Sequence, residues 1–338
     1  MPLNIEPKIA AAAAELTAIR RDIHAHPELG FEEERTSQIV AKKLKEWGCE
    51  VTTGIGKTGV VGTIRVGNNP TAIGLRADMD ALPMDEYNTF DHRSQHKGRM
   101  HACGHDGHTT MLLGAAQYLS ATRNFDGTVH FIFQPAEEGR GGAEAMVKDG
   151  LFDKFPCEQI FGMHNRPKLD VGKFAIRSGP QMAGGGLFDI HITGKGAHGA
   201  RPESGVDPVI IATQIISALQ TVVSRSVAAL DSAVISVTQM HAGDAYNVIP
   251  NEAVLRGTIR AFKKETMALV KERIETISTG IAKTLGGVAK PDVRVVFPPL
   301  VNDKDAVKFI ADVAAEIVGT DNMNREGPFV MASEDFSY

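Results

Sequence analysis

Hydrophobic residues recur at three- and four-residue spacing near the start of the chain, over Pro7–His26 and Glu33–Trp47, which predicts two amphipathic helices. Short runs rich in β-branched residues follow and predict strands at 59–66, 71–76, 128–134 and 159–164. Helical spacing returns between them, at 107–123 and 142–148. Strands that alternate with helices favour an α/β domain with a mixed, mostly parallel sheet flanked by helices.

The pattern changes after Gly179. The following segments read strand, helix, strand, strand, helix, strand, at 187–192, 208–229, 233–240, 253–262, 265–285 and 293–297. This βαββαβ order is that of a ferredoxin-like α+β unit. Helical spacing resumes at 303–318 in a piece too short to be a domain, so we expect the unit to be an insertion. The predicted organisation is one domain from residues 1–179 plus 300–338, and an inserted domain from 180–299.

Composition narrows the class of protein. The chain has 338 residues, a hydrophobic share of 43% and a formal net charge of −5, and it lacks the Lys/Arg runs of nucleic-acid or membrane-surface binders. No uncharged apolar stretch reaches the ~18 residues of a membrane span. The three cysteines, Cys49, Cys103 and Cys157, are an odd number typical of a reducing compartment. We therefore expect a cytoplasmic protein that acts on small molecules, with no nucleic-acid or membrane partner.

The densest polar cluster runs from Met100 to His108, just before a predicted helix. It places the Cys103 thiol, three imidazoles and the Asp106 carboxylate within a few residues, which is a combination typical of metal ligands. Each histidine taken alone could be a solvated residue at a helix start. The cluster as a whole is better explained by a metal site.

A second cluster contains Glu137 and Glu138, at the carboxyl end of a predicted strand, where open α/β sheets place their sites. Adjacent carboxylates raise one another's pKa unless a cation compensates. A metal ion compensates, and it lets one Glu ligate while the other carries protons. The alternative is a solvated acidic turn, which Pro135 and Gly139 would also suit.

Two more strand ends carry polar residues. Asp78 and Asp80 follow the strand that ends near Arg76, and His164 ends the strand after the Glu137 turn. A lone histidine in such a place is more often a core residue than a ligand. Its position beside the other strand ends favours a shared site.

Four segments occur in the order found in a known family: Arg76–Pro83, Met100–His108, Gln134–Gly139 and Gly194–Pro202. Across nearly the whole chain they resemble the signature series of the hippurate hydrolase, aminoacylase and auxin-conjugate hydrolase group of metal-dependent amidohydrolases and exopeptidases. The resemblance implies a zinc-exopeptidase-like fold with an inserted lid and dimerisation domain. It also implies hydrolysis of the amide bond of N-acyl amino acids by a metal-activated water.

The resemblance assigns roles in the first domain. It implies a set of ligands for two divalent ions: Cys103, His105, Glu138 and His164. Glu137 would be the catalytic general base, and Asp80 the acid that orients a neighbouring ligand or base. Zn, Mn, Ni and Co remain candidates, whereas a thiolate ligand disfavours Mg and Ca. Asp78 receives no role.

In the inserted domain, His198 resembles the catalytic histidine that reaches the other subunit's active site, which implies a homodimer through this domain. Asn247 and Arg260 resemble binders of the substrate's oxygen and carboxylate, because a guanidinium suits a carboxylate bidentately. For Arg260, a solvated arginine at a strand end is an equal alternative. His24 and His26 belong to the same pattern and are assigned structural roles.

The family's chain continues beyond the segment that resembles Ser333–Tyr338 and contributes one more histidine ligand. Two alternatives to an N-acyl-amino-acid hydrolase therefore stay open: a shortened, inactive metal-binding protein, and a dipeptidase or carboxypeptidase that uses the same site. The sequence does not choose the acyl group or the amino acid.

Overall fold

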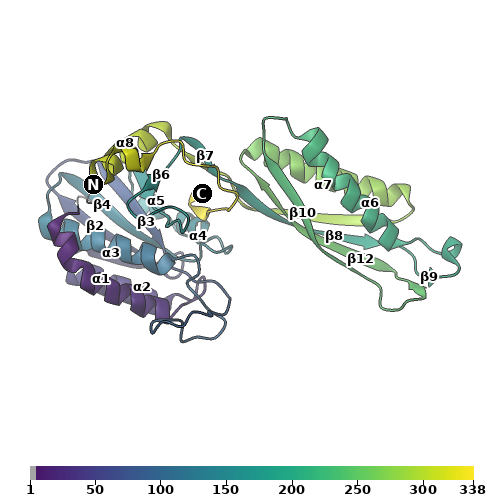
Figure 1. Cartoon of the computed structure of the whole chain (residues 1–338), viewed down its shortest axis with the longest axis horizontal. Helices are drawn as coiled ribbons and strands as arrows, with labels where there is room; N and C mark the ends of the chain where they lie inside the picture. The colour runs from purple at the N-terminus through teal and green to yellow at the C-terminus, as the bar shows by residue number, and fades with distance from the viewer. Residues whose placement is uncertain (1–4) are drawn as a thin grey trace. The chain divides into compact units, whose positions relative to one another are not determined.

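A computed structural model of the protein describes residues 5–338. Its contacts divide the chain into two units (Figure 1). Unit 1 runs to Ala175 and includes Asp305–Arg325 and Tyr338, whereas unit 2 comprises Ile176–Lys304 and Glu326–Ser337. The predicted class, a mixed α/β fold with an inserted ferredoxin-like unit, is confirmed by the two sheets described below.

Unit 1 is built on a five-stranded sheet in the order β1-β2-β4-β3-β5. Its strands are β1 (Glu50–Ile55), β2 (Gly59–Val66), β3 (Ala72–Asp78), β4 (Gly127–Gln134) and β5 (Gln159–Gly162). Strands β4, β3 and β5 are parallel, while β1 and β2 form an antiparallel hairpin that joins β4. The carboxyl ends of the three parallel strands therefore share one edge of the sheet.

Helices cover both faces of this sheet. They are α1 (Pro7–Ala25), α2 (Glu34–Glu46), α3 (His105–Thr122), α4 (Gly142–Lys148), α5 (Leu151–Lys154) and α8 (Lys304–Val318). Side chains alternate along β4: Phe131 and Phe133 pack with α1, α2 and α3, whereas Ile132 packs with Met146 of α4 and Leu151 of α5. This period-2 alternation fixes which strand residues face each layer.

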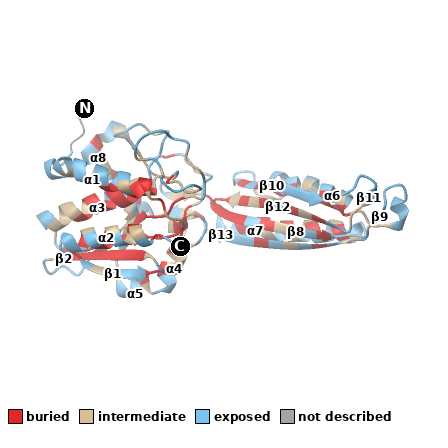
Figure 2. Ribbon diagram, turned by 90° about the horizontal axis from the view of Figure 1, so that it is seen from below, coloured by how far each residue is buried: buried red, intermediate tan, exposed pale blue. Residues whose placement is uncertain are grey.

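Unit 2 is a four-stranded antiparallel sheet in the order β10-β12-β8-β13 with two helices. In chain order the elements are β8 (Gly184–Thr193), α6 (Pro208–Thr221), β10 (Ala233–Ala242), β12 (Glu252–Ala261), α7 (Lys264–Thr284) and β13 (Val288–Phe297). The buried residues gather between the sheet and the two helices (Figure 2), and Ile190, Ile215, Leu255 and Ile274 are at its centre. Two small strand pairs also belong to this unit: β7 (Gly179–Met182) with β14 (Leu300–Asn302), and β9 (Ala197–His198) with β11 (Val248–Ile249). A third pair, β6 (Phe174–Ala175) with β15 (Met323–Asn324), belongs to unit 1.

The last segment departs from the predicted boundary. We expected 300–338 to belong to the first domain, but Glu326–Ser337 groups with unit 2. Backbone hydrogen bonds explain this, since Gly327 donates to Ile176 and Ala183 donates to Val330. In addition, the Arg177 guanidinium lies 3.7 Å from the Phe329 ring centroid. None of these three contacts leaves a periodic signal in the sequence.

The segment Pro208–Ser226, which is α6 and the π-helical turn after it, has the length and apolar composition of a membrane span. The sequence analysis expected no such stretch. Ile211, Ile215 and Leu219 of this helix are buried in the unit 2 core, whereas Ile210 is half exposed. Its apolar face is thus accounted for by packing on the sheet.

Candidate active site

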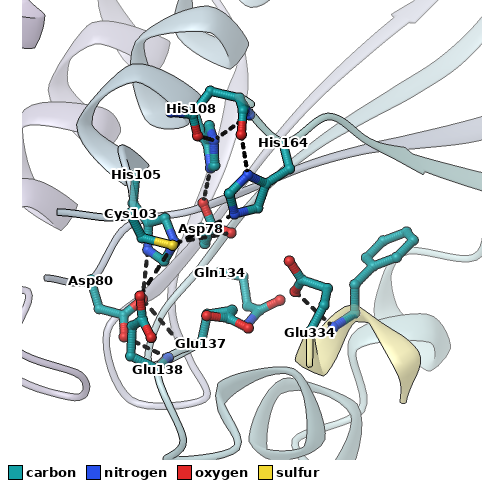
Figure 3. Close-up of polar contacts among 12 residues, drawn as sticks. Asp78, Asp80, Cys103, His105, His108, Gln134, Glu137, Glu138, His164 and Glu334 are labelled. Carbon is teal, nitrogen blue, oxygen red and sulfur yellow. Dashed lines mark hydrogen bonds and ion pairs between the residues drawn. The ribbon is translucent and has the colours of Figure 1, made fainter. Parts of the chain in front are cut away.

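The polar residues at the strand ends of unit 1 converge (Figure 3). Asp78 ends β3, Asp80 follows it, Glu137 and Glu138 follow β4, and His164 follows β5. Cys103 and His105 come from the loop that leads into α3. Because β3, β4 and β5 are parallel, their carboxyl ends bring these side chains to one edge of the sheet.

A tight loop places Cys103 and His105. Gly104 between them has φ +85°, a left-handed conformation that favours glycine. A Cβ at this position would lie 2.5 Å from the Asn165 Nδ2 atom, so there is no room for a side chain. His105 begins α3 directly afterwards and is buried, while Cys103 is partly exposed.

Hydrogen bonds orient the two candidate histidine ligands. The His105 Nδ1 atom lies 3.2 Å from Asp80 Oδ1, and His164 Nδ1 lies 2.7 Å from the Asn165 carbonyl oxygen. When each Nδ1 donates, the lone pair of each ring is on Nε2. His164 Nε2 is 3.7 Å from Cys103 Sγ, and His105 Nε2 is 3.9 Å from Glu138 Oε1. Both rings therefore present lone pairs toward the other candidate ligands.

The donor atoms suit metal ions. Ligand atoms of Cys103, His105 and His164 all lie within 4.8 Å of one another, and so do those of His105, Glu137 and Glu138. His105 Nε2 and Glu138 Oε1 are buried and have no hydrogen-bond partner among residues 5–338. A buried polar atom without a partner is costly unless a ligand compensates. Thiolate, imidazole and carboxylate together are the donors that divalent transition metals prefer.

Charge at the site also favours a cation. Burial, together with the Asp80 and Asp78 carboxylates, raises the pKa of Glu138. Burial opposes protonation of His105, but the Asp78 and Asp80 carboxylates outweigh it and raise the pKa of this ring well above its usual value. The Asp78 and Asp80 carboxylates thus stabilise a positive charge in the site.

Asp78, which received no role from the sequence analysis, is fully buried and pairs with the Arg76 Nη1 atom at 2.8 Å. Its other oxygen lies 2.6 Å from His108 Nδ1, and His108 Nε2 lies 2.6 Å from Asn165 Oδ1. His108 thereby joins the end of β3 to the residue after His164. The signal for it was its place in the metal-type cluster, three residues after His105.

His24, at the end of α1, contacts the first turn of α3, which directly follows the loop that carries Cys103. Asp106 Oδ2 lies 3.0 Å from both the Arg20 Nε and the His24 Nδ1 atoms, and His24 Nε2 lies 3.1 Å from Glu86 Oε1. Although burial opposes it, the contacts with His24 and Arg20 lower the pKa of Asp106 to about 2. The structural role expected for His24 remains a prediction, and this contact is its physical basis.

The candidate residues of unit 2 lie in two places. Exposed His198 on β9 (Ala197–His198) pairs with Val248 of β11 (Val248–Ile249), and Gly199 donates to the Asn247 carbonyl at 2.7 Å. Arg260 instead lies opposite Gly185, at the start of β8. His198 follows the far end of β8, and a strand rises about 3.3 Å per residue, so about 25 Å of strand separates them.

The sequence is similar to those of known peptidases and amidohydrolases. The profile of peptidase family M20/M25/M40 matches residues 74–338. Hippurate hydrolase of Campylobacter jejuni is 46% identical over 336 residues, which are 99% of this chain and 88% of that protein. N-acyl-L-amino acid amidohydrolase of Geobacillus stearothermophilus is 42% identical over 291 residues, 85% of this chain and 78% of that protein.

A solved structure is also similar. A Bacillus subtilis protein, described as a dinuclear metal binding peptidase from the M20 family, superposes with a TM-score of 0.83 at 36% sequence identity. The match covers 97% of this chain and 85% of that one.

Proposed function

The chain belongs to peptidase family M20/M25/M40, and on that premise we propose that it hydrolyses the amide bond of N-acyl amino acids of the hippurate type. The observation that carries the proposal is the convergence of thiol, imidazole and carboxylate donors at the strand ends, with Glu137 beside them. Cys103, His105, Glu138 and His164 would hold two divalent ions drawn from Zn, Mn, Ni or Co. Bound there, the ions would supply Lewis acidity and a water of lowered pKa.

Glu137 is the proposed proton carrier. Its side chain is buried beside His105 and Glu138, which limits competing contacts with bulk water. As general base it would accept a proton from the attacking water, and it would then donate that proton to the leaving amine. Asp80 would orient the site, because it contacts His105 through Oδ1 and accepts the amide hydrogens of Glu137 and Glu138.

The substrate's free carboxylate and the developing oxyanion need further groups. Arg260 would bind the carboxylate, Asn247 a substrate oxygen, and His198 the oxyanion. His198 and Arg260 lie near opposite ends of β8, and a small N-acyl amino acid cannot span about 25 Å. This separation supports a homodimer in which His198 acts on the partner subunit's site.

The location that we propose is the cytoplasm. Cys49, Cys103 and Cys157 are all free, and a thiolate ligand persists in a reducing compartment.

Amide hydrolysis by the metal-loaded chain tests the function. The chain is loaded with Zn, Mn, Ni or Co and assayed on N-benzoylglycine, an N-acetyl amino acid and a dipeptide. Preference for the N-acyl substrates supports the proposal, preference for the dipeptide favours a dipeptidase or carboxypeptidase, and no hydrolysis with bound metal favours an inactive metal-binding protein.

Complementation tests His198 separately. Chains carrying His198→Ala and Glu137→Gln are each expected to be inactive, but a mixture should regain activity because one hybrid site contains both native residues. Mixed dimers that form and remain inactive would exclude action in trans.

A further inference from the structure

Glu33 is a fully buried carboxylate that the proposed chemistry does not use. Its Oε1 atom accepts the Ala136 amide hydrogen at 2.8 Å, and its Oε2 atom accepts the Thr58 hydroxyl hydrogen at 2.6 Å. Among residues 5–338 it forms no ion pair with a cationic side chain. A buried carboxylate with only neutral donors is expensive to retain, so its contacts require an explanation.

One of these contacts is with a strained turn. Ala136 has φ +53°, a left-handed conformation that is unfavourable for an alanine, and its side chain is fully buried. The next residue is Glu137. The direction of the Glu137 side chain therefore depends on a backbone conformation that alanine does not favour by itself.

Buried carboxylates hold three successive amides of this turn. Ala136 donates to Glu33, Glu137 donates to Asp80 Oδ1, and Glu138 donates to Asp80 Oδ2. Figure 3 shows Asp80 beside the two glutamates. Asp80 also contacts the His105 ring, whereas Glu33 contacts neither candidate metal ligands nor their rings. The two acids thus hold different parts of the turn.

Packing leaves the turn little freedom elsewhere. Gly142 donates to the Ala136 carbonyl at 3.0 Å, and a Cβ on Gly142 would lie 1.6 Å from the Pro135 carbonyl oxygen. A Cβ on Gly30 would lie 3.0 Å from Ala136. The carbonyl side of Ala136 is therefore fixed by the chain itself. Its amide side is fixed by Glu33.

We propose that Glu33 is a positioning residue for Glu137, whose carboxylate holds the Ala136 amide in the left-handed turn and so directs the Glu137 side chain into the site. The inference rests on the proposed role of Glu137 as proton carrier. Without the bond, Ala136 relaxes toward negative φ and rotates the peptide that leads to Glu137. The metal donors remain in place, because Asp80 still holds the Glu138 amide.

Three single variants test the role. Glu33→Asp keeps the charge but withdraws the carboxylate by about 1.5 Å, one carbon–carbon bond. Glu33→Gln keeps the length and an acceptor oxygen for Ala136. Thr58→Val is the matched control, because it removes the other hydrogen bond of the same carboxylate and leaves the turn untouched.

For Glu33→Asp we expect kcat on N-benzoylglycine to fall ~10–100-fold, with KM nearly unchanged. Glu33→Gln should restore most of kcat, and Thr58→Val should lower stability without lowering kcat. Two readouts do not depend on turnover. Hydrogen exchange of peptides containing Ala136 should accelerate in Glu33→Asp alone, and cobalt(II) titration should give the wild-type affinity in all three variants.

A fourth variant exploits the strain. Ala136→Gly adopts positive φ at little steric cost, so it should recover part of the kcat that Glu33→Asp loses. If Glu33→Asp alone does not fold, Ala136→Gly is compared with the double variant in the same measurements. If Glu33 positions the turn, the double variant should again show faster hydrogen exchange at Ala136 and a lower kcat than Ala136→Gly.

Three results would overturn the proposal. They are wild-type kcat with wild-type exchange in folded Glu33→Asp, an equal fall of kcat in Thr58→Val, and a parallel loss of cobalt affinity and kcat. An active Glu137→Gln chain would instead refute the proposed base, and the exchange data would still decide whether Glu33 holds the turn.

Discussion

The two units differ in what they bury. In unit 2, the buried polar side chains of the sheet and its helices, Ile176–Lys304, are Thr266 and Ser278, and the rest of that core is apolar. The last segment of this unit, Glu326–Ser337, buries the carboxylates of Glu334 and Asp335. Unit 1 buries carboxylates and imidazoles as well: His24, Glu33, Asp78, Asp80, His101, His105, Asp106, His108, His130 and Glu137. Most of these groups lie under or beside the strand ends.

Because of this difference, we expect the buried polar groups of unit 1 to serve catalysis and the apolar core of unit 2 to serve stability. Buried polar groups lower stability unless they are paired, and unit 1 pairs many of them through Asp78, Asp80, Asp106 and their partners. Both ring nitrogens of His101 and the Nε2 atom of His105 have no hydrogen-bond partner among residues 5–338. The sheet of unit 2 instead carries its proposed functional residues at its ends, outside its core. Substitutions of the buried polar groups at the strand ends of unit 1 should therefore change activity, whereas substitutions in the apolar core of unit 2 should change stability.

The largest expected effect is at Glu137. Glu137→Gln should reduce turnover of N-benzoylglycine by ~10²–10⁴-fold because it removes the proton carrier. Metal content, measured by elemental analysis after dialysis, should stay at the wild-type level, since no proposed ligand is lost. Simultaneous loss of metal and activity would make Glu137 a ligand instead.

A core substitution in unit 2 should lower stability and leave the metal site of unit 1 unchanged. Leu255→Ala on β12 truncates a fully buried side chain and should lower the free energy of unfolding by ~2–5 kcal/mol. Cobalt(II) affinity at unit 1 should not change. Leu187→Ala on β8 is the control, because Leu187 is 45% exposed and its loss should cost no more than ~0.5 kcal/mol in a urea titration. Weakened cobalt binding in Leu255→Ala would contradict the separation.

Asp80→Asn should have a smaller effect than Glu137→Gln. The Asp80 carboxylate accepts two backbone amides and faces His105 Nδ1, whereas an asparagine offers one acceptor oxygen and turns an NH₂ toward a donor. We expect metal affinity or kcat to fall ~10–100-fold. Asp189→Asn on β8, which breaks the exposed pairs with Arg256 and Arg294, is the matched control and should leave both unchanged. Similar losses in the two variants would mean that charge alone, rather than these contacts, sets the effect.

Much of the fold could be predicted because its signals are local. The strand 59–66 and the helix 142–148 were predicted with the bounds that the structure has. Strand β1 was missed, since only Ile55 of Glu50–Ile55 is buried and a bulge between Thr53 and Ile55 breaks its alternation. The attachment of Glu326–Ser337 to unit 2 was missed because backbone hydrogen bonds, which have no residue signature, make it.

The candidate site shows the same limit. Strand-end position led to Asp80, Glu137, Glu138 and His164, and clustering led to Cys103 and His105, so the sequence predicted the convergence that the structure has. Nothing local joins Glu33 to Ala136, which are 103 residues apart, or His24 to Asp106, which are 82 apart. Such pairs depend on tertiary packing.

The smallest expected effect is the pH dependence that His130 gives to unit 1. This ring lies on β4, 2.9 Å from the Thr63 hydroxyl and against Phe155, and burial lowers its pKa below the usual value. The unfolded chain therefore binds a proton more readily. The stability that neutral His130 contributes is complete above pH ~6.5 and is lost as the pH falls below that value toward the folded pKa.

His130→Asn keeps a polar atom near Thr63 but does not titrate. Between pH 7 and 5 its free energy of unfolding should fall less steeply than that of the wild type, by at most about 1.4 kcal/mol per pH unit for one proton. Urea titrations at several pH values measure the two slopes. His191→Asn on β8 of unit 2, where the ring is exposed, should keep the wild-type slope. If His191→Asn flattens the curve as much as His130→Asn does, the buried histidine of unit 1 is not the source of the pH dependence.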